Sequence, residues 1–281
     1  MALQYLDRSI RPPTSAAQIT QRFASHDEWL MTDAERAALA GLLQRLKPQC
    51  AIEVGVYRAG SLALLAEHCP KVYALDIDPE CSARYRERFP NVTFITGPSQ
   101  ETLPRLIEQL QAAGEPLDFV LIDADHTEAG VRGDVTNVLR YRPQRPLYIV
   151  MHDSFNPGCR RGIREAPWAD NPYAHLLELD FVVGRFVNRE EPDGYRQMWC
   201  GLALGILLPE KRVGDFVIHQ NEPLMYQSAL RHSVYRYDKW WNPIYAATVL
   251  GRRLRHATGE QLKKYTPELY TALRKYRYPH A

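Results

Sequence analysis

The middle of the chain alternates short apolar runs with segments whose apolar residues recur at helical spacing. Five strand-like runs, at 51–56, 72–77, 92–96, 117–122 and 147–151, are separated by four helical patterns, at 60–68, from Pro79, at 100–113 and at 128–140. Repeated βα units of this length require a parallel sheet with helices on both faces, because crossovers between parallel strands are long and right-handed. The sequence therefore predicts a Rossmann-like α/β fold.

The strand pattern changes after Asp153. Two further strand-like runs, 181–188 and 199–208, are separated by the polar turn 189–194, which predicts an antiparallel hairpin. We therefore expect a mostly parallel sheet of seven strands that ends in an antiparallel strand. In such sheets, ligands bind beyond the carboxyl ends of the strands, near the point where the strand order reverses.

Segments of different character flank this region. Thr32 and Glu35 have the spacing of a capping box, and the leucines that follow predict a helix to about Lys47. Residues 1–30 predict an irregular arm, and the aromatic and basic residues after about 212 predict a helical tail. We expect an N-terminal arm and helix at 1–48, a binding domain at 49–210 and a helical C-terminal extension at 211–281.

The composition is that of an ordinary soluble globular protein. Hydrophobic residues make up 45% and charged residues 24%, and the five cysteines show no C-x-x-C spacing, so we expect them to be reduced and buried. The first residues lack the pattern of a signal peptide, and no run is long and apolar enough to span a bilayer. We therefore expect a cytoplasmic protein, and a net charge of +2 gives no support for nucleic-acid binding.

The first strand runs into a glycine turn, Glu53-Val54-Gly55-Val56-Tyr57-Arg58-Ala59-Gly60-Ser61, which opens a helix. Gly55 permits a tight turn, and Gly60 permits a ligand to approach the free N–H groups of the helix start. A dinucleotide site would favour G-x-G-x-x-G, which this turn lacks. Asp76 ends the second strand, where it is placed to accept hydrogen bonds from ribose hydroxyls. The alternative for the turn is a plain strand-to-helix connection.

The turn and Asp76 together resemble the first two motifs of class I S-adenosylmethionine-dependent methyltransferases. The resemblance implies that Glu53, Gly55, Gly60 and Ser61 hold the methionine part of the cofactor and that Asp76 holds its ribose. Ser99 follows the third strand, where that family contacts adenine, although a helix N-cap explains a serine there equally well.

Acids and histidines follow the fourth and fifth strands. Asp123 and His126 lie in the segment Asp-Ala-Asp-His, and His152 and Asp153 end the next strand. Such a cluster is costly to desolvate unless it binds a cation or transfers protons. Simple His–carboxylate pairing and helix capping by aspartate are the alternatives.

The segment Asp-Ala-Asp-His resembles Asp-Ala-Asp-Lys of the cation-dependent catechol and caffeoyl-CoA O-methyltransferases. The resemblance implies that Asp123 lies by the cofactor as a metal ligand, that Asp153 is a second ligand and that His126 is the general base, with His152 as a second candidate. Ser154 replaces the asparagine ligand of that family. Residues 50–160 also resemble the small-molecule and sugar O-methyltransferases grouped with cephalosporin-hydroxylase-like proteins.

These observations predict an O-methyltransferase that uses S-adenosylmethionine and Mg²⁺ and acts on a hydroxylated small molecule. Arg160 and Arg161 are candidates for binding an anionic acceptor, the alternative being solvated loop arginines, and Trp168, Trp199, Trp240 and Trp241 are candidates for stacking or core packing. The alternatives to this function are RNA methylation, a non-catalytic cofactor-binding scaffold and an NAD-dependent oxidoreductase. We expect the aromatic tail to pack over the active site or against a second subunit of a homodimer rather than to bind RNA.

Overall fold

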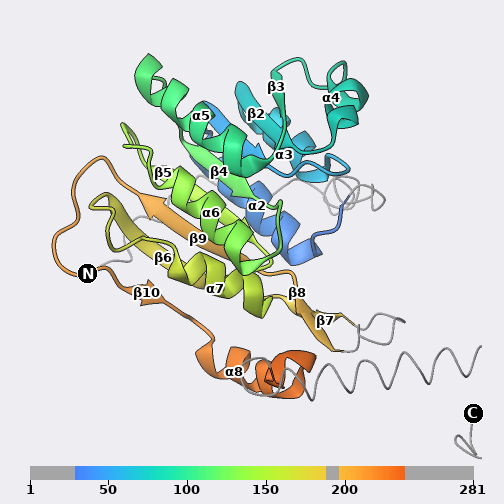
Figure 1. The fold of residues 1–281 in the computed structure, drawn as a ribbon, viewed down its shortest axis with the longest axis vertical. Coiled ribbons are helices and arrows are strands. Elements are labelled where there is room, and N and C mark those ends of the chain that lie inside the picture. The colour runs from blue at the N-terminus through green and yellow to red at the C-terminus, as the bar shows by residue number, and fades with distance from the viewer. Residues whose placement is uncertain (1–28, 188–195, 238–281) are drawn as a thin grey trace, which may run out of the picture.

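The computed structural model describes residues 29–187 and 196–237 (Figure 1). One sheet of eight strands in the order β10-β6-β9-β5-β4-β1-β2-β3 dominates it. The strands are β1 Cys50–Val54, β2 Lys71–Asp76, β3 Val92–Thr96, β4 Phe119–Ile122, β5 Leu147–His152, β6 Ala174–Val182, β9 Leu202–Leu207 and β10 Ile218–His219. Strands β1 to β5 are parallel, and β9 runs antiparallel between β5 and β6.

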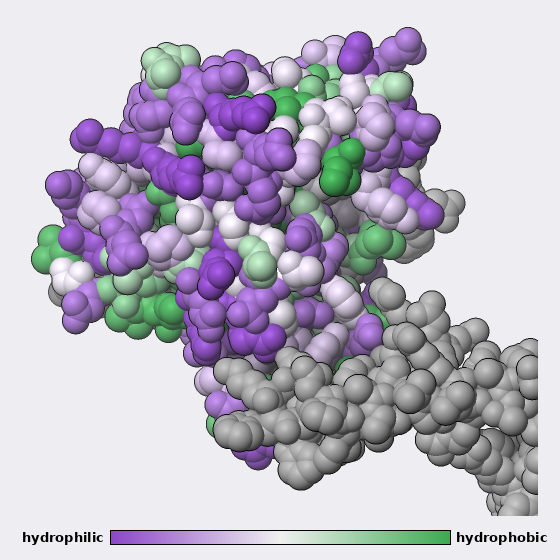
Figure 2. Space-filling model, in the orientation of Figure 1, coloured by the Kyte–Doolittle hydropathy of each residue, from purple (hydrophilic) through white to green (hydrophobic). Residues whose placement is uncertain are grey.

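Helices cover both faces of this sheet, as the βα alternation predicted. They are α2 Asp33–Leu46, α3 Gly60–His68, α4 Pro79–Tyr85, α5 Ser99–Ala113, α6 Glu128–Val138 and α7 Pro157–Glu165. Helix α8 Pro223–His232 and a short 3-10 helix at Val234–Tyr237 lie off the sheet faces (Figure 1). In the orientation of Figure 1, α5, α6 and α7 lie in front of the sheet, and on the same face in Figure 2 hydrophilic residues predominate over them. Among the described helices, none is long and apolar enough to cross a membrane.

Two apolar clusters form the core, one on each face of the sheet. Leu103 and Ile107 of α5, Val135 of α6 and Ile163 of α7 pack on one face. Leu39 and Leu43 of α2 pack on the other with Leu62 and Leu65 of α3. All five cysteines are free and buried, as predicted.

The predicted hairpin is present but differs in its bounds. The pair in the main sheet is β6 with β9, whereas the tips form a separate two-stranded sheet of β7 Arg185–Val187 and β8 Gln197–Trp199. The bend lies at Gly184 and Gly201. At Gly184 a side chain would clash with the backbone oxygens of Trp199 and Cys200, and Gly201 has a φ of +87°, which favours glycine. The predicted turn at 189–194 lies outside the described residues.

The edge strand β10 makes the described sheet one strand larger than the seven predicted. Its residues Ile218 and His219 pair in parallel with Leu177 and Glu178 of β6. The chain then continues into α8, whose Met225, Tyr226 and Leu230 pack with Phe155 and Met198. The predicted division of the chain at residues 48 and 210 stays a prediction.

The helix predicted from the capping box is confirmed as α2. The Thr32 hydroxyl accepts a hydrogen bond from the Glu35 N–H, and the Glu35 carboxylate accepts one from the Thr32 N–H. This arrangement satisfies donors that a helix start otherwise leaves unpaired. The Glu35 side chain is nevertheless fully buried, which a surface cap does not require.

Candidate active site

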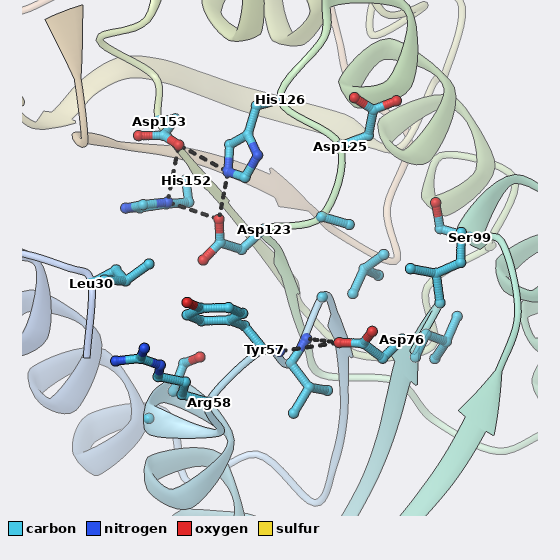
Figure 3. A pocket seen from close by; sticks show the side chains of 18 of the residues that line it. Leu30, Tyr57, Arg58, Asp76, Ser99, Asp123, Asp125, His126, His152 and Asp153 are labelled. Atoms are coloured by element: carbon cyan, nitrogen blue, oxygen red, sulfur yellow. Dashed lines mark hydrogen bonds and ion pairs between the residues drawn. The ribbon is translucent and has the colours of Figure 1, made fainter. Parts of the chain in front are cut away.

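A pocket of about 1120 Å³ lies beyond the carboxyl ends of β1, β2, β4 and β5. The strand order reverses between β1 and β4, so the turns after these two strands are neighbours at the position where α/β sheets bind ligands. Figure 3 shows Asp123, His126, His152 and Asp153 on one side of the pocket and Asp76 and Ser99 on the other. The structure thus brings together residues predicted from four separate strand ends.

The glycine turn is built on unusual backbone conformations. Gly55 has φ +90°, and Tyr57 and Ala59 also have positive φ, at 49° and 60°. A Cβ at residue 55 would lie only 2.1 Å from the backbone oxygen of Asp123. A side chain is therefore excluded there by both the backbone angle and the contact with the segment after β4. Gly60 and Ser61 open α3 and line the pocket.

Asp76 fixes this turn as well as facing the pocket. Its Oδ2 accepts hydrogen bonds from the backbone N–H groups of Val56 (2.8 Å) and Tyr57 (3.1 Å), and its Oδ1 accepts one from Asp78 (2.8 Å). Figure 3 shows the carboxylate beside the turn. Because a carboxylate offers about four acceptor positions, Asp76 retains capacity for a ligand hydroxyl.

Glu53 lies beneath the turn and is fully buried, and the lining of the pocket does not include it. The Ser61 hydroxyl donates a hydrogen bond to its carboxyl group. Burial raises the pKa of Glu53 well above its usual value, and the Ser61 hydrogen bond opposes this only in part. The structure therefore places Glu53 as a support for Ser61 rather than in direct line with a ligand.

Ser99 is the first residue of α5, and the N-cap position belongs to Pro98. Capping therefore does not account for this serine. Ser99 and the Gln100 amide instead hydrogen-bond the buried Asp134 of α6, the Gln100 contact being 2.7 Å. Burial raises the pKa of Asp134 to about 6. Both Ser99 and Gln100 line the pocket.

Asp123, His126, His152 and Asp153 form an acid–histidine cluster. His152 Nδ1 lies 2.8 Å from Asp123 Oδ1 and 3.5 Å from Asp153 Oδ2, and His126 Nε2 lies 3.0 Å from Asp153 Oδ2 and 3.4 Å from Asp123 Oδ1 (Figure 3). Asp153 has φ +56°, and its Oδ1 accepts a 2.5 Å hydrogen bond from the Cys200 N–H. One ligand atom from each of the four side chains lies within 4.8 Å of the others, so the cluster is compact enough to hold one ion.

Opposite charges dominate the electrostatics of the cluster. Hydrogen bonds to Asp123 and Asp153 raise the pKa of His126 to about 10. Burial lowers the pKa of His152, but the charges of Asp123 and Asp153 outweigh this and raise it well above its usual value. Burial raises the pKa of Asp123, but the two histidines outweigh burial and lower it. The carboxylates therefore favour the charged form of both imidazoles.

Glu35 of α2 also contacts the cluster, a contact that the sequence did not indicate. Its Oε1 lies 3.2 Å from His152 Nε2, while its Oε2 caps α2. Burial raises the pKa of Glu35, but the hydrogen bond and charge of His152 outweigh it and lower the pKa. His152 thus lies between two carboxylates: Asp123 hydrogen-bonds its Nδ1, and Glu35 lies 3.2 Å from its Nε2 at ion-pair distance but without hydrogen-bond geometry. The capping box fully explained Glu35 in the sequence, so no signal of its second contact was present.

The arginines proposed as anion ligands have other partners. Arg160 is buried in α7, pairs with Asp180 at 2.7 Å and lies over the ring of Tyr226 at 4.0 Å from its centroid. Arg161 pairs with Glu128 at 2.6 Å. Arg160 is therefore neither a solvated loop residue nor an anion ligand of the pocket, because its charge is used to hold β6 and α8 to α7.

The tryptophans separate into core and pocket. Trp168 is buried and stacks on Phe216, so it belongs to the core. Trp199 lines the pocket, with its ring edge-on to His126 at a centroid distance of 5.8 Å. Tyr57, 59% exposed, also lines the pocket. Trp240 and Trp241 lie outside the described residues.

Comparison with known proteins identifies the domain. Residues 52–154 match the model of a family described as a methyltransferase domain. This part of the chain is therefore similar to methyltransferase domains. The match supports the prediction of a methyltransferase. No curated protein sequence matches the chain significantly.

Solved structures similar to this methyltransferase include three bound to cofactor or product. An O-methyltransferase from Bacillus cereus in complex with SAH is 16% identical, over 72% of this chain and 94% of its own, with a TM-score of 0.47. The O-methyltransferase TomG from Streptomyces achromogenes, in complex with SAM, is 16% identical over 72% and 93%, with a TM-score of 0.46. Cofactor-bound Rv0187 from MTB is 21% identical over 70% and 89%, with a TM-score of 0.47.

Proposed function

We propose that the methyltransferase transfers the methyl group of S-adenosylmethionine to a hydroxyl of a small molecule, such as a sugar or a natural product. The observation that carries this proposal is that the glycine turn and the acid–histidine cluster line one pocket. At about 1120 Å³ the pocket exceeds the range of roughly 300–1,000 Å³ that is typical of a site for one small ligand. A cofactor and an acceptor therefore fit side by side.

The donor side would be formed by the turn and the neighbouring strand ends. The free N–H groups at Gly60 and Ser61 would meet the methionine part, and the remaining acceptor capacity of Asp76 would meet the ribose. Ser99, at the start of α5, would lie by the adenine, and Asp123 by the methyl end of the cofactor. Glu53 would act on the cofactor through the hydroxyl of Ser61.

The acceptor side would lie against the acid–histidine cluster. In the transfer the S–C bond breaks, a C–O bond forms and the hydroxyl loses its proton, so a group that accepts this proton speeds the reaction. We assign that role to His126, whose side chain is 44% exposed and faces Trp199 across the pocket. His152 is buried between Glu35 and Asp123, which leaves it poor access to an acceptor.

The charge state of His126 sets a condition on this role. An imidazole that is already protonated accepts no proton, and the two carboxylates hold the pKa of His126 at about 10 in this structure. The shift disappears when the carboxylate charges are neutralised, because these carboxylates are its cause. The base role therefore requires that Asp123 and Asp153 have a positive partner other than His126.

The sequence predicted Mg²⁺ as that partner, held by Asp123 and Asp153. Mg²⁺ prefers an octahedron of oxygen ligands that includes several waters. Here Nδ1 of His152 lies 2.8 Å from Oδ1 of Asp123, the oxygen expected to bind the ion, and it occupies one side of the site that oxygen ligands would need. The side chains present fit Mg²⁺ poorly, and the transfer proposed above assigns no step to it.

Calorimetry with S-adenosylhomocysteine and with NAD tests the donor side. We expect S-adenosylhomocysteine to bind and NAD not to bind, and binding of NAD alone would overturn the proposal. A screen of hydroxylated sugars and phenols with labelled S-adenosylmethionine tests the acceptor, with the matching amines as controls. Label transferred to amines but to none of the hydroxyl compounds would show that oxygen is the wrong acceptor atom.

A further inference from the structure

The ribbon of β7 and β8 presents different residues on its two faces. In such a ribbon, residues directly opposite each other and residues two apart along a strand point to the same side. Arg185 is paired with Trp199, and Val187 lies two residues after Arg185. All three line the pocket. Phe186 and Met198, the pair between them, therefore face the other way.

The face of the ribbon that points away from the pocket is anchored in a small apolar cluster. Met198 is fully buried there with Phe155, and the ring of Phe186 lies edge-on to that of Phe155 at a centroid distance of 6.4 Å. Helix α8, beside the ribbon in Figure 1, contributes Met225 and Leu230 to the same cluster. An isolated two-stranded ribbon is only marginally stable, so this packing is what holds it as a wall of the pocket.

This wall lies on the acceptor side of the pocket. The indole of Trp199 meets the imidazole of His126, the proposed base, with ring centroids 5.8 Å apart. The indole N–H donates a 2.7 Å hydrogen bond to Oε1 of Gln197 on the same strand, which fixes the orientation of the ring. The indole therefore offers a ligand ring surface rather than its N–H. Because Arg185 is the cross-strand neighbour of Trp199, base, indole and guanidinium follow one another along the wall.

Arg185 brings a positive charge to this wall that no described acid neutralises. Its side chain is exposed, and in the described part of the chain no carboxylate lies within ion-pair distance of it. The other two arginines of the pocket lining lie elsewhere, since Arg84 pairs with Asp78 at 3.8 Å and Arg58 lies over the ring of Tyr57 in the glycine turn. A guanidinium beside an apolar ring suits a ligand whose ring carries an anionic group.

The acid–histidine cluster determines which way such a ligand can bind. Asp123 and Asp153 lie beside His126, and like charges disfavour an anionic group next to them. At the other end of the wall, Arg185 attracts the same group. The two ends together direct the hydroxyl of a ring compound toward His126 and its anionic group toward Arg185.

We propose that the acceptor is a ring compound with a carboxylate or phosphate at the end away from the reacting hydroxyl, that Arg185 binds this anionic group and that Trp199 contacts the ring. A guanidinium binds both kinds of anion through paired hydrogen bonds. The inference rests on the proposed function and deepens it, because it adds a charge requirement to the acceptor. The role that the sequence suggested for Arg160 and Arg161 passes to an arginine that lines the pocket.

The first experiment measures the binding of matched acidic and neutral probes to the whole protein, with and without S-adenosylhomocysteine. The pairs are para-hydroxybenzoate with para-hydroxybenzamide, and glucuronate and glucose phosphate each with glucose. Calorimetry should show at least one acid binding about 10-fold or more tightly than its neutral partner, because charge-assisted hydrogen bonds are about twice as strong as neutral ones. The tighter acid distinguishes carboxylate from phosphate. Equal or weaker binding of every acid, or no binding of any, overturns the proposal.

The second experiment locates the anionic subsite. In Arg185→Gln the preference for the acid should disappear, while binding of the neutral partner changes by less than about twofold. Arg185→Lys should keep part of the preference, because lysine retains the charge but not the paired hydrogen bonds. Arg84→Gln is the matched control from the same pocket lining and should keep the preference intact. A preference that survives in Arg185→Gln, or that is lost in Arg58→Gln instead, overturns the assignment.

Trp199→Leu separates the contact with the ring from the contact with the charge. Loss of the indole should weaken the binding of both members of a pair by about 2- to 10-fold, the usual range for an aromatic contact. The ratio between acid and neutral partner should stay the same, because the indole does not read the charge. A ratio that falls while binding of the neutral partner is unchanged contradicts this division of roles.

Methyl transfer separates this inference from the proposed function. If S-adenosylhomocysteine binds and methyl is transferred from S-adenosylmethionine to neutral hydroxyl compounds only, the function stands and the anionic subsite falls. If the acids are preferred through Arg185 but neither S-adenosylhomocysteine nor S-adenosylmethionine binds, the subsite stands and the function falls.

Discussion

The two sides of the pocket are built by different means. The donor side is made by one continuous stretch, Glu53 to Ser61, whose backbone conformation is fixed by Gly55 and by the carboxylate of Asp76. The acid–histidine cluster is made by side chains from the ends of β4 and β5, with Glu35 of α2 behind them. A backbone site can be recognised from a short motif, whereas a cluster of side chains depends on which segments the fold brings together.

Charge distinguishes the two sides as well. The only carboxyl group beneath the glycine turn in the described structure, Glu53, has its pKa raised by burial and a hydroxyl as its partner. In the cluster, the histidines lower the pKa of the buried Glu35 and of the partly exposed Asp123. Of these carboxyl groups, Glu53 therefore tends toward neutrality, whereas Glu35 and Asp123 tend to keep their charge. The two sides meet where the turn lies against Asp123: the Asp123 N–H donates a 2.8 Å hydrogen bond to the Val54 carbonyl, and Gly55 packs on the Asp123 backbone.

The packing of Gly55 on Asp123 gives the largest predicted effect. In Gly55→Ala the new Cβ would lie 2.1 Å from the Asp123 oxygen, and the residue would have to keep φ +90°. We expect a loss of about 4 kcal/mol or more in unfolding free energy, because overpacking and backbone strain add. Binding of S-adenosylhomocysteine should be lost even where the variant folds. Urea unfolding and calorimetry measure the two effects.

Gly41→Ala is the matched control for this variant. Gly41 lies inside α2, and no atom lies within 4 Å of the position its Cβ would take. The substitution should stabilise the protein by about 0.5–1 kcal/mol, because alanine favours a helix over glycine. If Gly55→Ala behaved like Gly41→Ala, the two sides of the pocket would not be in contact at residue 55.

The sequence predicted the fold well where local pattern decides the structure. The alternation of strands and helices from Cys50 to His152 follows from apolar periodicity, and α2 follows from its capping box. The start of β6 was missed because Glu178 and Asp180 look like solvent-facing residues. Asp180 is instead buried against Arg160, and Glu178 accepts hydrogen bonds from backbone N–H groups, including that of Asn221. Partners so distant in the chain leave no local signal.

The same limit applies to the site. Gly55 and Asp76 lie at the ends of two consecutive strands and could be predicted together, and later strand ends identified Asp123 and Asp153. Glu35 could not be predicted, because its contact with His152 requires α2 to pack beneath the end of β5. Whether His152 faces the acceptor or the protein interior is likewise a result of packing, which the sequence left open.

His126→Ala tests whether the chemistry resides in the cluster. We expect turnover to fall by about 10²- to 10⁴-fold, the usual contribution of a general base, while the affinity for S-adenosylhomocysteine changes by less than about twofold. Steady-state kinetics and calorimetry measure these quantities separately. His68→Ala is the control, since His68 contacts its own helix at Leu64. An unchanged rate in His126→Ala would exclude it as the base and move the role to water or to His152.

Asp76→Asn tests the donor side in the converse way. The asparagine keeps an acceptor oxygen for the glycine turn but removes the negative charge of the side chain. We therefore expect S-adenosylhomocysteine to bind about 10- to 100-fold more weakly. The turnover number at saturating cofactor should be largely unchanged. Asp78→Asn is the comparison, because Asp78 caps α4 and asparagine caps equally well. Similar losses in the two variants would show that Asp76 has no particular role at the ribose.

The smallest effect concerns Asp134, a buried carboxyl group at the donor side that has neutral partners in Gln100 and Ser99. Burial raises its pKa from 3.8 to about 6, so the folded state binds more protons than the unfolded state between these values, and stability falls as pH rises through 6. Asp134→Asn removes this dependence. Its stability relative to wild type should therefore grow by about 1.4 kcal/mol from pH 5 to pH 8.

Urea unfolding at both pH values measures the difference, with the exposed Glu101→Gln as a control that should show none. A difference that shrank with rising pH would mean that Asp134, like Asp123, is stabilised as an anion, and the contrast in charge between the two sides of the pocket would then be wrong.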